Sequence, residues 1–287
     1  EVKAQVEAKN VTWDVVDVEL SDAIRGCDEG LLENLNLADL PAGSDGTPAA
    51  KDFIAGTLSD CAVPNIVWTT IAAYDKTKFP GDKPKTMADF FDTKKFPGKR
   101  GLRKSAKATL EMALMADGVQ GADVYTTLGT KAGLDRAFAK LDSIKGDVVW
   151  WESGAQPPQI LADGEVVMTT AYNGRIFNAA VSEGKPFEII WDGQVFDVDL
   201  YVIPKGSKNK AAAWDYIKFA TASKQLAAQA SWISYGPARL SSAALVGNHA
   251  DKGFDMKPHM PTSPANFKLA VQSNLEFWAD KNDEINE

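Results

Sequence analysis

Motifs that commonly identify an enzyme are missing from this sequence of 287 residues. It has no GxSxG nucleophile elbow, no GxxxxGK[ST] phosphate-binding loop, no GxGxxG fingerprint, no HExxH motif and no Asp-rich calcium loop. Its only histidines, His249 and His259, lie in a segment near the end that contains Pro and Gly, with no thiol beside them. The usual nucleophiles, bases and metal ligands are therefore absent, and we expect no catalysis, no metal and no cofactor.

Long runs of charge or of apolar residues are also absent. Lys and Arg number 31 against 39 Asp and Glu, a net charge of −8, and no basic run could form an arm for nucleic acid. The most apolar stretch, Ala62–Tyr74, contains Asn65 and is far shorter than the roughly 20 apolar residues of a membrane-spanning helix. We expect neither a nucleic-acid partner nor a membrane span. The length and a hydrophobic content of 45% suit a globular protein with more than one core.

Cysteine is scarce, since Cys27 and Cys61 are the only two. Neither has a histidine or a second thiol nearby that would indicate a metal site or a redox motif. We prefer a disulfide between them to the alternative of two buried thiols. Such a bond would indicate an oxidising compartment.

The regular elements expected from the sequence alternate between strands and helices. Helices are predicted over Glu1–Ala8, from a capping Ser105 to Gly118, and around Ala213–Ala220. Short runs rich in β-branched and aromatic residues predict strands at Val11–Val18, Ile66–Tyr74, Asp147–Trp151, Val166–Tyr172, Phe187–Trp191 and Phe196–Ile203. This alternation indicates α/β sheets.

Polar residues beside aromatic ones mark the ends of several predicted strands. Most of the eight tryptophans should lie in the core, yet Trp68–Thr69 stands where the ligand clefts of α/β sheets open. Asp197 and Asp199 are separated by one residue in a predicted strand and so share a face, which suits acid–base work, cation binding or a solvated strand edge. The sequence therefore favours a small-molecule ligand.

Several segments match one family in the same order along the chain. They are TWDVVDVELSDAIRGCDEGLLENLN, CAVPNIVWTTIAAYDK, ILADGEVVMTTAYNGR, FDVDLYVIPKGSKNKAAAWDYIKFA, and SYGPA followed by the late FWAD. Together they resemble the spermidine/putrescine-type solute-binding proteins of bacterial ABC importers over essentially the whole chain. The strand, helix and second strand with which that family begins have no counterpart here, so we expect part of the first lobe to be missing.

The resemblance implies a fold, a location and partners. The fold is the type II periplasmic-binding fold, with two discontinuous α/β lobes joined by crossing hinge segments. We expect residues 1–70 and 203–237 in one lobe, and residues 71–202 and 238–287 in the other. The family closes on a small-molecule ligand in the cleft, works in the periplasm and delivers to ABC permease subunits in the inner membrane. We expect a monomer.

The resemblance also places pocket residues. Asp199 matches the family's aspartate ahead of the Ile-Pro of the return strand, which holds an ammonium group. Tyr172 matches the aromatic residue of the family's WNG motif, and Tyr235 matches its late pocket tyrosine. An aliphatic chain between aromatic faces is then plausible, with core packing as the alternative for both tyrosines.

The sequence departs from polyamine binders at the start of one helix. The family's two acidic residues there are replaced by Ser105 and Ala108, and the neighbouring residues are Arg103, Lys104 and Lys107. A helix N-terminus with such neighbours favours an anion.

A further cation follows the WNG-type motif. Arg175 carries a planar guanidinium suited to a carboxylate, although it could simply be a surface residue. With Asp199 for an amine and Arg175 for a carboxylate, we expect a short zwitterion such as 4-aminobutyrate. A polyamine is the alternative ligand, and an enzyme is the less favoured class of function.

Overall fold

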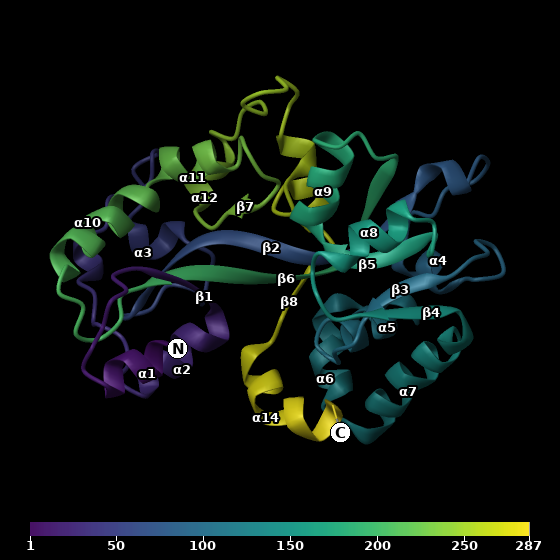
Figure 1. The fold of residues 1–287 in the computed structure, drawn as a ribbon, viewed down its shortest axis with the longest axis horizontal. Helices are drawn as coiled ribbons and strands as arrows, with labels where there is room; N and C mark the ends of the chain where they lie inside the picture. The colour runs from purple at the N-terminus through teal and green to yellow at the C-terminus, as the bar shows by residue number, and fades with distance from the viewer. Residues whose placement is uncertain (287) are drawn as a thin grey trace. The chain divides into compact units, whose positions relative to one another are not determined.

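The computed structural model describes residues 1–286 and divides the chain into two compact units. Unit 1 comprises Glu1–Val67 and Asp197–Ser263, and unit 2 comprises Trp68–Phe196 and the chain from Pro264 onwards. Both units are discontinuous because two long strands, β2 (Ala62–Asp75) and β6 (Phe187–Val202), run from one unit into the other (Figure 1).

Unit 2 is built on a mixed sheet. The strands β3 (Arg100–Arg103), β4 (Val148–Trp151) and β5 (Met168–Tyr172) are parallel, with β3 between the other two. The part of β2 after Thr69 runs antiparallel to β5, with Thr70 opposite Tyr172. Elsewhere in the unit, β8 (Val271–Gln272) runs parallel to the middle of β6, at Val195 and Phe196.

Helices cover both faces of the unit 2 sheet, with α8 and α9 on one side and α5 and α7 on the other (Figure 1). The alternation of side chains along β2 produces this arrangement. Ile71 and Ala73 join a core cluster with residues of α8 and α9, whereas Ala72 and Tyr74 join a second cluster with residues of α4 and α5. The helices of unit 2 are α4 (Met87–Phe91), α5 (Thr109–Ala116), α6 (Val124–Leu128), α7 (Lys131–Asp142), α8 (Gln156–Ala162), α9 (Asn173–Val181), α13 (Pro264–Phe267) and α14 (Leu275–Asn286).

Unit 1 contains the remaining regular elements. The strand β1 (Val16–Glu19) is antiparallel to the end of β6, with Glu19 opposite Asp199, and β7 (Gly236–Pro237) is antiparallel to the start of β2. The helices of unit 1 are α1 (Val2–Glu7), α2 (Leu20–Asp28), α3 (Ala49–Asp52), α10 (Lys210–Ala220), α11 (Ser223–Gln229) and α12 (Leu240–Ala243).

The predicted disulfide is confirmed. Cys27 at the end of α2 is bonded to Cys61, which is fully buried and directly precedes β2. Their Cα atoms are 5.8 Å apart, within the range that disulfides require.

Some predicted elements differ from the observed ones. The predicted strands 187–191 and 196–203 form one strand, β6, because Gly193 adopts φ +68° and lets the strand continue through a segment that suggests a turn. Ser105 does not cap α5, which begins at Thr109 after Ala108, a residue with φ +69°. The first predicted strand, Val11–Val18, is reduced to β1, which begins at Val16.

The observed division of the chain differs from the predicted lobes after β7. Residues 238–263, predicted to belong to the second lobe, cluster with unit 1. A buried ion pair explains part of this difference. Arg239 lies 3.1 Å from the carboxylate of Asp52, a residue of unit 1 that comes much earlier in the sequence. The crossings lie at Val67/Trp68 and Phe196/Asp197, a few residues before the predicted positions.

Candidate functional site

The carboxyl ends of the parallel strands in unit 2 bring together residues that are far apart in the sequence. Arg103 ends β3, Trp151 ends β4 and Tyr172 ends β5, with Arg103 opposite Trp151 in the ladder. Because β2 is antiparallel to β5 and Thr70 is opposite Tyr172, Trp68 and Thr69 reach the same edge. This edge, which we call the unit 2 rim, is where ligands of α/β sheets bind.

Tyr172 lies at the centre of an aromatic cluster on the rim. Its ring meets Trp68 edge-on, with centroids 5.2 Å apart, and the fully buried Trp151 in the same manner at 5.9 Å. Gly154 permits this position, because a Cβ there would lie 2.6 Å from Cε2 of Tyr172. The guanidinium carbon of Arg103 lies 5.7 Å from the centroid of the Tyr172 ring. These contacts fix the orientation of the tyrosine.

Two further rim residues are fixed by a hydrogen bond between β2 and α9. The backbone N–H of Thr69 donates to Oδ1 of Asn173 at 3.2 Å, and both residues are fully buried. This hydrogen bond therefore holds β2 against the start of α9 at the rim. Arg175, two residues after Asn173, is exposed in the first turn of α9.

Ser105 lies in a cavity of unit 2 whose lining does not include Tyr172. It is partly buried and lines a cavity of about 560 Å³ within unit 2, together with Lys104, Ala106, Thr109, Leu110, Phe138, Leu141, Trp150 and Ile285. Trp150 is half exposed there, whereas its neighbour Trp151 points to the other side of β4 and contacts Tyr172. The aromatic contacts of Tyr172 are with Trp68 and Trp151, and the placement of Ser105 in the ligand site stays a prediction.

The predicted site residues of unit 1 lie on β6 and beside β7. Asp197 is buried and its Oδ1 accepts a hydrogen bond from the backbone N–H of Val198 at 2.9 Å, whereas Asp199 is partly buried. One strand runs through both, so the two carboxylates share a face of β6. Tyr235 is partly buried and immediately precedes β7, whose Gly236 pairs with Val67.

A buried polar network fixes the chain just after Tyr235 and β7. The carboxylate of Asp52 accepts from Nη1 of Arg239 at 3.1 Å, from the backbone N–H of Ser241 at 2.8 Å and from the Ser241 hydroxyl at 2.7 Å. Nη2 of Arg239 donates to the carbonyl of Pro41 at 2.8 Å, and the guanidinium lies over Phe53. Burial lowers the pKa of Arg239, and the charge of Asp52 opposes that shift.

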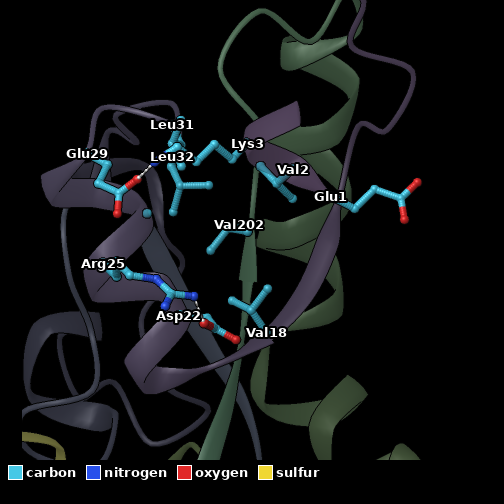
Figure 2. A pocket seen from close by; sticks show the side chains of 11 residues that line it. Glu1, Val2, Lys3, Val18, Asp22, Arg25, Glu29, Leu31, Leu32 and Val202 are labelled. Carbon is cyan, nitrogen blue, oxygen red and sulfur yellow. Dashed lines mark hydrogen bonds and ion pairs between the residues drawn. The ribbon is translucent and has the colours of Figure 1, made fainter. Parts of the chain in front are cut away.

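Unit 1 also contains a cavity of about 340 Å³ that none of the predicted site residues lines. Figure 2 shows it between α1, α2 and β1, with Val18, Val202 and Leu32 among its apolar lining. The ion pairs at its edge, such as Lys3 with Glu29 at 2.8 Å, are exposed and contribute little stability. Its lining offers no buried charge that would select a ligand.

Neither a metal-binding cluster nor a membrane-spanning helix is found in the described part of the chain. Within residues 1–286, no group of three or more His, Cys, Asp or Glu side chains is placed to hold a metal ion. Over the same range, no helix has the length and apolar character that crossing a bilayer requires.

Sequence reasoning missed the way in which the rim forms. Strand β3 was not predicted, because Arg-Gly-Leu-Arg contains no β-branched or aromatic residue. Its Gly101 is required by packing, since a Cβ there would clash with the side chain of Thr169. Without β3, nothing in the sequence places Arg103 beside Tyr172. No local signal identifies this strand, because the segment becomes a strand only through pairing with β4 and β5.

Comparisons with known proteins agree on the type of protein. The profile of a family described as bacterial extracellular solute-binding protein matches residues 1–262. A "Gamma-aminobutyric acid-binding protein" of Pseudomonas aeruginosa is 45% identical over 284 residues, which cover 99% of this chain and 76% of that protein. The "Spermidine/putrescine-binding periplasmic protein" of Salmonella typhimurium is 24% identical over 238 residues, 82% of this chain and 66% of the relative. A solved structure of a GABA receptor is 34% identical with a TM-score of 0.76, and the alignment covers 99% of this chain and 82% of that one.

Proposed function

Because the chain belongs to the bacterial extracellular solute-binding protein family, we propose that it captures a short ω-amino acid, such as 4-aminobutyrate, for an ABC importer. The observation that carries this proposal is the aromatic cluster around Tyr172 on the unit 2 rim, with the guanidinium of Arg103 against the Tyr172 ring. Asp199 would bind the ammonium end, and Arg175 the carboxylate end. Tyr172, Trp68 and Tyr235 would contact the aliphatic chain between them.

The charge of the candidate residues supports a zwitterion over a diamine. A diamine carries an ammonium group at each end, and the end near a guanidinium would be repelled and left without an acceptor. The replacement of two acidic positions by Ser105 and Ala108 removes the acceptors that polyamine binders offer. The relative that is 45% identical is named for 4-aminobutyrate, which supports the same choice.

Polyamine binding is the second candidate. Asp199 and the aromatic residues would suit an amine equally well, and a more distant relative, 24% identical, is named for spermidine and putrescine. The two ligand classes differ in their need for a cation in the site. Replacing Arg175 therefore distinguishes the two ligand classes, since only the ω-amino acid needs its positive charge.

The proposed function includes a location and a partner. We propose that the protein works as a monomer in the periplasm and delivers its ligand to permease subunits in the inner membrane. The Cys27–Cys61 disulfide supports the location, because such bonds persist in oxidising compartments.

Asp199→Asn and Arg175→Ala are each expected to weaken binding of 4-aminobutyrate by more than about 2 kcal/mol, because each removes a charged partner from one end of the ligand. Isothermal titration calorimetry of both variants measures this. Asp163→Asn and Arg136→Ala are matched controls, since both residues are exposed and belong to unit 2 away from the rim, and they should bind like the parent. A variant that binds within about threefold of the parent would remove its residue from the site.

A further inference from the structure

The arginines of this chain fall into two groups according to what their guanidinium groups contact. Of the six, four donate to acceptors of the protein: Arg25 to Asp22, Arg100 to backbone carbonyls, Arg136 to Asp117 and Arg239 to Asp52. For the other two, Arg103 and Arg175, no described residue supplies a hydrogen-bond acceptor or an acidic partner to the guanidinium. Arg175 is exposed, but Arg103 is partly buried.

The two arginines of β3 show how different these groups are. Arg100, at the start of the strand, is fully buried and donates to the carbonyls of Phe90, Gly98 and Phe96, each at 2.6 Å. It completes the structure around the preceding loop, and burial lowers its pKa to about 10. Arg103, at the other end of the same strand, lies on the rim with its N–H donors uncommitted. The strand thus has one structural arginine and one available for a ligand.

The position of the Arg103 guanidinium is determined by Tyr172. At 5.7 Å from the ring centroid, it is within the distance of a cation–π contact. Tyr172 is itself held by Trp68, Trp151 and the close approach of Gly154. A cation on a fixed aromatic face is preorganised, which reduces the entropy lost when a ligand binds.

We propose that Arg103 is a specificity-determining residue whose guanidinium, together with that of Arg175, binds the carboxylate of the ligand on the unit 2 rim. This proposal rests on the proposed function and deepens it. The planar fork of an arginine matches a carboxylate with two parallel hydrogen bonds, which a lysine cannot form. The same positive charge repels an ammonium group. Arg103 therefore selects ligands that carry a carboxylate at one end and disfavours diamines.

The test compares Arg103→Met, Arg103→Lys and Lys104→Met by calorimetry with 4-aminobutyrate and with putrescine. Arg103→Met should weaken 4-aminobutyrate binding by about 30-fold or more, and it should leave putrescine binding unchanged or strengthened. Arg103→Lys keeps the charge without the fork and should lose about tenfold. Lys104→Met is the matched control: it removes the same charge one residue away, from an exposed side chain that pairs with Glu152.

The outcomes separate this inference from the proposed function. If the parent protein binds 4-aminobutyrate but Arg103→Met binds it within about threefold, Arg103 is not in the site and the proposed function stands. An equal loss for putrescine, or an equal loss in Lys104→Met, would also overturn a specific role for Arg103. If the parent binds no ω-amino acid, both proposals fail. Because Arg103→Lys retains the side-chain bulk at the strand end, it keeps the test valid should Arg103→Met fail to fold.

Discussion

Replacing Arg239 with methionine is expected to lower the free energy of unfolding by about 3–5 kcal/mol, because it leaves the carboxylate of Asp52 buried without its cation. Asp52 and Arg239 are both only 1% exposed. The two donors from Ser241 remain, but they do not neutralise the charge. Urea titration of the parent and the variant measures the difference.

Arg136→Met is the matched control for this prediction. Arg136 also pairs with an aspartate, Asp117, but both side chains are more than one third exposed. Water and salt screen such a pair, so its loss should cost about 1 kcal/mol or less. The double variant Asp52→Leu/Arg239→Met should be less destabilised than the two single losses combined. Equal effects in Arg239→Met and Arg136→Met would show that burial does not matter here.

Removing the Cys27–Cys61 disulfide is expected to lower the free energy of unfolding by about 4 kcal/mol. The bond closes a loop with a sequence separation of 34 residues, and opening it returns that conformational freedom to the unfolded chain. Chemical denaturation with and without a reductant measures the change.

The double variant Cys27→Ala/Cys61→Ala is the control, because its stability should not respond to the reductant. Mass spectrometry after alkylation, without prior reduction, gives an independent check. Two alkylated thiols in the parent protein would contradict the disulfide, and the inference of an oxidising compartment would be lost with it.

Strands that carry their own β signal could be predicted from the sequence. Val148–Trp151 and Met168–Tyr172 are rich in β-branched or aromatic residues, and both lie inside predicted strands. Strand β3 could not be predicted, because its Arg-Gly-Leu-Arg sequence becomes a strand only through pairing with β4 and β5. Local propensity was overridden there by tertiary pairing.

The candidate site shows the same limit. The candidate residues Asp199 and Tyr172 were chosen by resemblance, and their role in ligand binding stays a prediction. Which cation lies beside Tyr172 could not be predicted, because Arg103 and Tyr172 are 69 positions apart and meet only through parallel neighbours in the sheet. Likewise, only the structure shows that the guanidinium of Arg100 donates its hydrogen bonds to backbone carbonyls of the protein.

The measurement that tests the central claim most directly is a calorimetric comparison of 4-aminobutyrate, putrescine, spermidine and a dicarboxylate of similar length on the purified protein. The account predicts that 4-aminobutyrate binds more tightly than either polyamine. At 100 times its dissociation constant, such a ligand also stabilises the folded protein by about 2.7 kcal/mol. Binding of putrescine or spermidine, with no binding of any compound that carries a carboxylate, would contradict the account. A dicarboxylate as the tightest ligand would show that Asp199 does not face it.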